Sequence, residues 1–358
     1  MPSCLFFLLF LVPVAFADQG FKQVIQPRAW QFPQDFGRHD EFETEWWYFT
    51  GNLFTDAGRH FGYQVTFFRS GMSPGTPDRP SRWAASDLYY AHAAITDIER
   101  RRFAHHDLLS RARPGLAWAA DDTLDVRLLD WHAKLVDART IKLFARDDDG
   151  RFEIDLTATI ERGPILQGPG GVSKKGREPG QASYYHSITR LRTAGTLTID
   201  GEAHAVTGLS WMDQEFSSNV LSDGQVGWDW LCLQMADGRD IKAFQLRRED
   251  GTADYTAATV VAADCTVAYL DPADVVLDGS EPWTSPTTGG AYPQHWRVKL
   301  GRETLTVRSL LPDQEISAGD AGGVSYFEGA IEAVDEAGNV VGRGYLEMTG
   351  YDEPLSGF

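Results

Sequence analysis

Two acidic residues in the segment 208–216, Asp213 and Glu215, have the side chains and spacing best suited to proton transfer. In a β-strand, alternate residues share a face, so both carboxylates would lie beside Trp211. Burial against aromatic rings raises the pKa of a carboxyl group, and a neighbouring carboxylate raises it further. The two residues could then form an acid/base pair. The alternative is a surface turn with solvated acids, which the residue types alone favour slightly.

Glu45 has similar surroundings in the first half of the chain, where it precedes the aromatic residues 46–48. If this segment is a strand, Glu45 and Trp47 share one face, and the residues on either side of Trp47 share the other. A glutamate among aromatic rings could be an acid. It could equally form a salt bridge with an arginine, such as Arg69 or Arg190.

Two further clusters combine polar groups with aromatic rings. Asp229 lies between Trp228 and Trp230, and a phenol precedes an imidazole at Tyr185 and His186. Histidine titrates near neutral pH, so His186 could carry a proton. A single histidine in a strand is, however, more often a structural residue.

Other catalytic motifs are not found in the sequence. There is no H-E-x-x-H, C-x-x-C or G-x-S-x-G, so nothing supports a zinc protease, a thiol redox enzyme or an α/β-hydrolase. His105 and His106 are adjacent rather than spaced to share one metal ion, and we expect no metal site. The glycine-rich segment 163–180 contains lysines but lacks the phosphate-loop pattern G-x-x-x-x-G-K-[ST]. We expect it to be a long loop or an interdomain connection.

The elements around these residues are predicted to be β-strands. Residues 40–69 and 226–247 each contain an aromatic run, an Asp/Gly/Arg turn and a second apolar run, which is the pattern of a hairpin. Two matching hairpins in the two halves suggest a duplicated β domain. Many short strands and no βαβ pattern predict antiparallel sheets that close into barrels or sandwiches. Residues 98–113 are basic and could form a short helix or an irregular excursion.

These patterns predict domains at residues 30–182 and 183–358, preceded by a leader at 1–17. The leader has an apolar run and a small-x-small site ending at Ala17, which indicates a signal peptide and export to the periplasm or the medium; a retained anchor is the alternative. The formal net charge of −18 argues against nucleic acid and anionic membrane surfaces as partners. Cys232 and Cys265 could pair after export, although Cys232 in a strand-like run favours free thiols.

Four groups of motifs occur in order along nearly all of the mature chain. They are Glu45-Trp46-Trp47-Tyr48-x-Thr50-Gly51-x-Leu53; Gly171-x-Ser173-x-Lys175-Gly176 with Ser183-Tyr184-Tyr185-x-Ser187-x-x-Arg190; Gly208-x-x-Trp211-Met212-Asp213-x-Glu215; and Tyr326-x-Glu328-Gly329 with Gly344-Tyr345-Leu346-Glu347-x-Thr349-Gly350-Tyr351. With these motifs the chain resembles the AttH / carotenoid 1,2-hydratase (hydroxyneurosporene synthase) group of lipocalin-like proteins.

The resemblance implies two lipocalin-like β-barrel domains, a small apolar ligand and, for the carotenoid branch, addition of water to a carbon–carbon double bond without a cofactor. On this reading a buried acid, Asp213, protonates the alkene, and Glu215 or His186 handles the water. Aromatic faces stabilise the carbocation by cation–π attraction. The expected ligand-binding residues are Glu45, Trp46, Trp47, Tyr48, Tyr185, Trp211, Trp228, Asp229 and Trp230.

Two functional hypotheses therefore remain, a hydratase and an exported carrier that passes an apolar ligand to or from an envelope ABC-type transporter. A hydratase requires a buried acid without a basic partner, whereas a carrier has little need for one. If Asp213 and Glu215 were neutralised by arginines such as Arg190 or Arg247, they would be structural. A hydrolase is a third possibility, but no nucleophile is recognisable.

Overall fold

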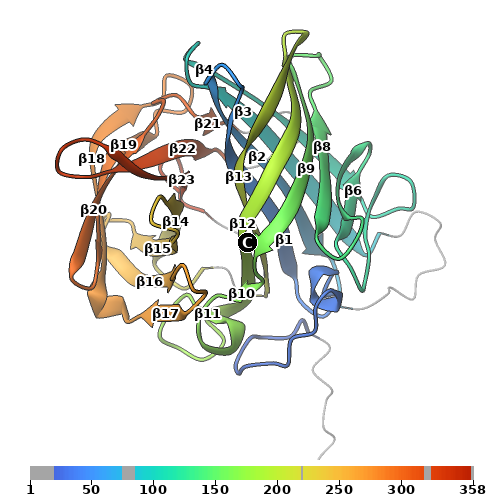
Figure 1. Cartoon of the computed structure of the whole chain (residues 1–358). Coiled ribbons are helices and arrows are strands. Elements are labelled where there is room, and N and C mark those ends of the chain that lie inside the picture. Colours follow the sequence, from blue (N-terminus) through green and yellow to red (C-terminus); the bar gives the residue numbers. More distant parts are fainter. Residues whose placement is uncertain (1–19, 75–84, 219–220, 318–323, 356–358) are drawn as a thin grey trace, which may run out of the picture.

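The computed structural model describes residues 20–74, 85–218, 221–317 and 324–355, so the expected signal peptide at 1–17 lies outside the described residues. The described part consists of 23 strands and three short 3-10 helices, η1 (Gln34–Phe36), η2 (Pro169–Gly171) and η3 (Pro272–Asp274). The strands form two curled antiparallel sheets (Figure 1). The prediction of an all-β antiparallel fold is therefore confirmed. No helix among the described residues is long or apolar enough to cross a membrane.

The first sheet has the strand order β4-β3-β2-β1-β13-β12-β9-β8-β7-β6-β5, with β10 and β11 paired to β12. Its strands are β1 (Thr44–Phe54), β2 (His60–Gly71), β3 (Asp87–Asp97), β4 (Arg102–Arg111), β5 (Ala117–Ala119), β6 (Asp125–Leu128), β7 (Trp131–Leu135), β8 (Thr140–Arg146), β9 (Phe152–Arg162), β10 (Ile165–Leu166), β11 (Val172–Lys174), β12 (Ala182–Ile199) and β13 (Glu202–Ser217).

The second sheet has the order β17-β16-β15-β14-β23-β22-β20-β19-β18, with β21 paired to β22. Its strands are β14 (Gln225–Met235), β15 (Asp240–Arg248), β16 (Ala253–Val261), β17 (Val267–Leu270), β18 (Val275–Thr284), β19 (Ala291–Leu300), β20 (Glu303–Ser309), β21 (Glu315–Ile316), β22 (Tyr326–Val334) and β23 (Val340–Thr349). In both sheets the aromatic hairpin, β1–β2 or β14–β15, pairs through its first strand with the last strand of the sheet. The matching hairpins of the sequence thus occupy equivalent places.

Three local expectations differ from the structure. The limit expected after residue 182 falls at the start of β12, whereas the chain changes sheet between β13 and β14, because β12 and β13 pair with β9 and β1. The loop at 163–180 is not a connection between the sheets, since β10 and β11 within it pair with β12. Residues 102–111 form the edge strand β4 rather than a helix, and an edge strand readily carries charged side chains.

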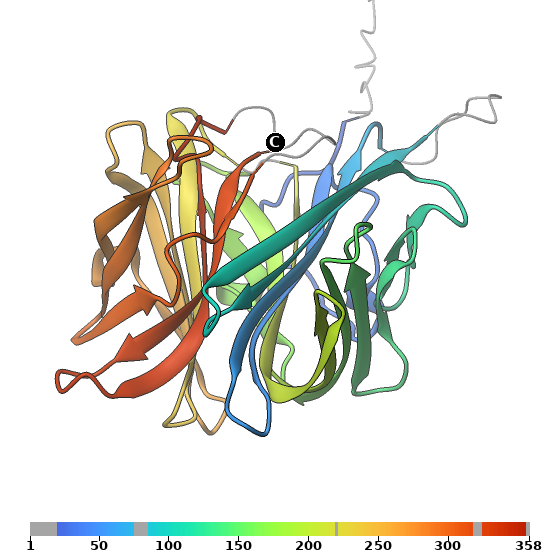
Figure 2. The same ribbon diagram turned by 90° about the horizontal axis from the view of Figure 1, so that it is seen from above.

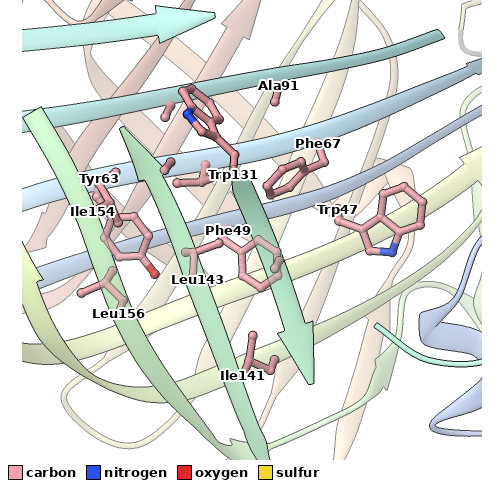
Figure 3. Close-up of a cluster of buried hydrophobic side chains, with 14 of the residues drawn as sticks. Trp47, Phe49, Tyr63, Phe67, Ala91, Trp131, Ile141, Leu143, Ile154 and Leu156 are labelled. Carbon is pink, nitrogen blue, oxygen red and sulfur yellow. The ribbon is translucent and has the colours of Figure 1, made fainter. Parts of the chain in front are cut away.

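Strand alternation explains how each sheet encloses its own core. In β1, Trp47 and Phe49 point into the first sheet and pack with Tyr63, Phe67 and Trp131, all of which are buried (Figure 3). A separate cluster lies inside the second sheet and includes Tyr292, Trp296 and Phe327. Burial of these large rings is the main stabilising contribution of each core.

The two sheets contact each other through their outer faces, where β1 meets β23 and where β2 and β3 meet β22. Figure 2 shows the second sheet, coloured yellow to red, beside the first. A third apolar cluster fills this contact and includes Tyr48, Trp211 and Trp230. The contact is also polar: the buried Asp240 of β15 binds Arg162 at 2.6 Å and Arg190 at 2.7 Å, both from the first sheet.

The two cysteines of the described residues are free thiols. Cys232 is buried in β14, and Cys265 is exposed in the turn between β16 and β17. Cys232 contributes to the apolar cluster between the sheets, as a small hydrophobic residue does.

Candidate functional site

A cavity of about 360 Å³ opens between the outer faces of the two sheets. Its size lies within the range of small-molecule sites. The two groups of side chains that line it differ in character. The aromatic ones include Trp46, Tyr48, Phe68, Tyr90, Tyr185, Trp228, Trp230, Phe244 and Tyr326, and the ionisable ones include Arg69, His92, Lys175, Glu215, Glu328 and Glu347. Most of the residues expected to bind a ligand therefore do meet at one place.

Asp213 lies behind the wall of this cavity and is fully saturated with hydrogen bonds. Its carboxylate accepts bonds from the hydroxyl of Tyr185 at 2.6 Å, the indole of Trp211 at 2.8 Å and the hydroxyl of Ser187. Burial raises the pKa of Asp213 to about 6, although these donors act in the opposite direction. Tyr185 lines the cavity, and its oxygen also accepts a hydrogen bond from the Trp230 indole at 3.0 Å. Tyr185 therefore connects Asp213 to the cavity.

Glu215 lines the cavity but has a basic partner. Its carboxylate lies 2.6 Å from the Lys175 Nζ and accepts a hydrogen bond from Ser183. Lys175 directly follows β11, in the glycine-rich segment that the sequence presents as a loop. Glu215 is therefore ion-paired, and its partner is a lysine rather than an arginine.

Two further glutamates form a different kind of pair. Glu328 of β22 and Glu347 of β23 are directly opposite each other across the two strands, and both line the cavity. Burial raises the pKa of Glu328 well above its usual range and that of Glu347 to about 8, and the charge of Glu347 also raises the pKa of Glu328. Within the described residues neither has an ion-pair partner, so the surroundings favour the protonated form of both carboxyl groups.

The two oxygens of Glu328 differ. Its Oε2 accepts a hydrogen bond from the Tyr48 hydroxyl at 3.0 Å, which connects β22 to the first sheet. Its Oε1 is buried and has no hydrogen-bond partner among the described residues. A buried polar atom without a partner is costly, and it is therefore a candidate for contact with a ligand.

His186, Trp47 and Asp229 were expected at the site but lie elsewhere, and Trp211 does not line the cavity either. The ring of His186 is on the opposite face of β12 from Tyr185, packs against Trp30 and Phe32, and donates a hydrogen bond to the Asp35 carbonyl at 3.2 Å. Burial lowers the pKa of His186 to about 4, so the imidazole is neutral. Trp47 belongs to the core of the first sheet.

Two of the expected acids have basic partners, Asp229 away from the cavity and Glu45 in its lining. The Glu45 carboxylate is bound by His39 at 2.8 Å and lies 4.0 Å from Arg69, which is the salt-bridge alternative considered for it. Asp229 is 3.0 Å from Arg247. Both carboxylates are thus neutralised by structural contacts.

Glu328, Glu347 and Lys175 belong to the motifs of the sequence but were not predicted as site residues, and neither was Lys242. Glu328 and Glu347 each follow a tyrosine by two residues, at Tyr326 and Tyr345, and so share a strand face with it. No group of three or more His, Cys, Asp or Glu side chains in the described ranges is arranged to hold a metal ion.

Comparison with known proteins identifies the family. The AttH-like family model matches residues 23–351. The crystal structure of a candidate AttH from Nitrosomonas europaea is 33% identical, with a TM-score of 0.85 and coverage of 92% of this chain and 100% of that one. Kievitone hydratase from Nectria haematococca is 17% identical, with a TM-score of 0.69 and coverage of 94% and 97%. CghA in complex with Sch210972 is 14% identical, with a TM-score of 0.51 and coverage of 94% and 98%.

The second and third structures establish a likeness of fold alone, because their identity is low. No curated protein sequence matches the chain. The family model spans nearly all of the chain, and the Nitrosomonas protein is similar in both sequence and structure. The resemblance seen in the motifs is confirmed, and the chain belongs to the AttH-like family.

Proposed function

We propose that this protein is a hydratase that adds water to a carbon–carbon double bond of an apolar small molecule bound between the two sheets. The observation that carries the proposal is the Glu328 carboxyl group, which is buried, lines the cavity and has no hydrogen-bond partner at Oε1 among the described residues; burial also raises its pKa well above the usual range. A carboxylic acid kept neutral at pH 7 by its surroundings can act as a general acid.

In the first step the Glu328 Oε1–H bond breaks and its proton adds to one alkene carbon. The other alkene carbon becomes a carbocation, and Glu328 becomes a carboxylate. Tyr48 donates a hydrogen bond to that carboxylate through Oε2 and so stabilises the charge that develops. The faces of Trp228 and Trp230, which line the cavity, attract the cation.

In the second step a water oxygen bonds to the carbocation and loses a proton. The Tyr185 oxygen accepts this proton while its own hydroxyl proton passes to Asp213, to which it is hydrogen-bonded at 2.6 Å. Asp213 has a pKa of about 6 and is mostly ionised at pH 7, so it can accept the proton. Return of that proton to Glu328 through solvent completes the cycle. Asp213 thus serves as the base rather than as the acid expected from the sequence.

The family context supports the same class of reaction. Kievitone hydratase has this fold along nearly the whole chain, and its name describes a hydration. Its low identity carries no residue roles to this chain. The proposal for the present protein therefore rests on Glu328 and its surroundings.

The test uses farnesol, an isoprenoid with trisubstituted double bonds, incubated with the purified protein in oxygen-18 water. Mass spectrometry should detect a product that has gained one labelled water. Glu328→Gln should lower the rate at least ~100-fold, because general acid catalysis contributes about 10²–10⁴-fold. A matched control is Glu332→Gln, which lies on the same strand but is bound to Arg308 at 2.6 Å and does not line the cavity.

Equal loss in both variants would indicate damage to β22 rather than loss of an acid. Labelled product formed at the wild-type rate by a folded Glu328→Gln protein would refute the assignment of Glu328. No labelled product from the wild-type protein, with farnesol bound and recovered unchanged, would favour the second candidate function.

That second candidate is a carrier that binds an apolar ligand without converting it. The aromatic lining of the cavity favours it, because such a surface binds an apolar molecule whether or not chemistry follows. The carrier would be exported through the predicted signal peptide and would exchange its ligand with an envelope ABC-type transporter. Cell fractionation of the full chain, with and without residues 1–17, tests the export step common to both candidates.

A further inference from the structure

Glu328 and Glu347 line the same cavity but differ in their exposure to solvent. Glu328 is fully buried, with 0% of its surface exposed, whereas Glu347 is partly exposed. The two residues are directly opposite each other on β22 and β23. Opposite side chains of an antiparallel pair have Cβ atoms roughly 5 Å apart, so the two carboxyl groups can meet directly or through one water molecule.

The proposed reaction leaves Glu328 as a carboxylate, which needs a new proton before the next turnover. Bulk solvent has no direct access to this side chain, because none of its surface is exposed. Its Oε1 atom has no hydrogen-bond partner among the described residues. The proton must therefore come from a neighbouring group that is itself in contact with solvent.

The hydroxyl and imidazole groups near Glu328 are poor sources of that proton. Tyr48 donates a hydrogen bond to Oε2, but burial raises the pKa of this phenol well above its usual range. Tyr326 shares a strand face with Glu328, yet its hydroxyl is bonded to the His92 Nδ1 at 2.8 Å, and burial raises its pKa in the same way. Burial lowers the pKa of His92 to about 4, so its imidazole is neutral at pH 7.

Glu347 is the neighbouring group that has an acidic proton. Burial raises the pKa of Glu347 to about 8, and the charges of Glu215 and Asp213 add to this effect. The Trp228 indole and Lys175 act in the opposite direction. Lys175 is, however, paired with Glu215 at 2.6 Å and forms no ion pair with Glu347 in the described part of the chain. The surroundings therefore favour the protonated form of Glu347 at pH 7.

We infer that Glu347 returns the proton to Glu328 after each turnover. This inference rests on the proposed function, since it names the proton donor to the acid of the same reaction. The Glu347 O–H bond breaks, and its proton forms an O–H bond with the Glu328 carboxylate. Glu347 becomes a carboxylate and then takes a proton from water in the cavity. Two neighbouring carboxyl groups resist simultaneous ionisation, so the pair keeps one proton throughout the exchange.

The experiment follows labelled-water incorporation into farnesol by the full chain at pH 7 under two conditions. With protein in excess, each molecule reacts once and needs no new proton; with farnesol in excess, each molecule must be reprotonated. Glu347→Gln keeps the shape of the protonated acid but has no acidic proton. Its steady-state rate should fall at least ~10-fold more than its single-turnover rate, because a positioned proton donor contributes about 10²–10⁴-fold.

A second readout distinguishes proton transfer from a structural role. Glu347→Ala removes the carboxyl group and leaves space for a small proton donor. Its steady-state rate should rise with the concentration of imidazole buffer at constant pH and ionic strength. The control is Glu332→Gln, which is bound to Arg308 at 2.6 Å and does not line the cavity. Neither the control nor the wild-type protein should respond to imidazole.

Equal falls of the two rates in Glu347→Gln would overturn the inference, as would a steady-state rate equal to that of the wild type. A folded Glu347→Ala protein whose rate does not respond to imidazole would also overturn it. In each case, labelled product formed by the wild-type protein and lost in Glu328→Gln would still uphold the hydratase proposal. If the wild-type protein forms no labelled product, the inference and the hydratase proposal fail together.

Discussion

Two pairs of acids stand at the same cavity, and their neighbours give them opposite properties. Asp213 and Glu215 on β13 are surrounded by donors and lysines, so one has a pKa of only about 6 and the other is held as an ion pair. Glu328 and Glu347 have each other and one donor each, the Tyr48 hydroxyl and the Trp228 indole, and burial raises the pKa of Glu347 to about 8 and that of Glu328 well above its usual range. Burial alone does not decide the charge of a carboxyl group; the number of donors and cations around it does.

Of the changes that test this difference between the two acid pairs, removing the charge of Asp213 should have the largest effect on turnover. Asp213→Asn cannot accept the proton that Tyr185 releases, so we expect turnover to fall about 100-fold. The wild-type rate should decline below pH about 6, as Asp213 becomes protonated. The acidic limb should disappear in Asp213→Asn, as measured in pH–rate profiles of labelled-water incorporation.

The matched control is Asp229→Asn, a buried aspartate that is paired with Arg247 and does not line the cavity. Its rate per folded molecule should stay close to that of the wild type. An Asp213→Asn protein with an unchanged acidic limb would show that Asp213 is a structural residue.

Replacing the carboxyl group of Glu347 by an amide tests the difference between the two acid pairs through the free energy of unfolding. The unfolded carboxyl group ionises near pH 4.5, but the folded one holds its proton until pH about 8, so the free energy of unfolding falls as the pH rises through this window. Glu347→Gln removes that dependence. The free energy of unfolding of the variant should exceed that of the wild type by about 2 kcal/mol at pH 8 and by much less at pH 5. Solvent in the cavity keeps the difference at pH 8 from being larger.

Urea unfolding curves at the two pH values measure this difference. Glu332→Gln again serves as the control, since its ion pair with Arg308 gives no reason for the same pH trend. A Glu347→Gln advantage that is equal at pH 5 and pH 8 would contradict protonation of the native carboxyl group.

The smallest expected effect concerns the one hydrogen bond to the acid pair from the first sheet. Tyr48→Phe removes the donor to Glu328 Oε2 and keeps the ring. The donor favours the charged form of Glu328, so its loss should raise the pKa of that group further and slow turnover about fivefold, or about 1 kcal/mol. Single-turnover rates check the change, and an accelerated reaction would reverse the role assigned to Tyr48.

Much of the fold follows from local patterns that the sequence displays. The two aromatic hairpins and the short strands predicted antiparallel sheets, because alternation and turn residues act over a few positions. The domain limit was misplaced because the pairing of β12 with β9 is decided by contacts far along the chain. Likewise, the charges of residues 102–111 did not reveal that they form an edge strand.

The site was predictable in its aromatic part and less so in its acids. Tyr185, Trp228 and Trp230 were identified from residue type, and the cavity lining contains all three. Glu328 and Glu347 required the register between β22 and β23, which places them opposite each other and which no local pattern specifies. His186 was expected at the site, but alternation places a neighbour of Tyr185 on the other side of the sheet, where its ring packs against Trp30.

The pairing of each sheet's first strand with its last has a consequence for how the protein comes into being during synthesis. β1 pairs with β13, and β14 pairs with β23, so neither sheet can close until its final strand has left the ribosome. Contacts between such distant residues slow folding. Glu328 and Glu347 belong to the last hairpin, so the acid pair is the final part of the site to be made. A nascent chain can thus build its first core long before it acquires Glu328 and Glu347, and the cavity is complete only when the last hairpin has been made.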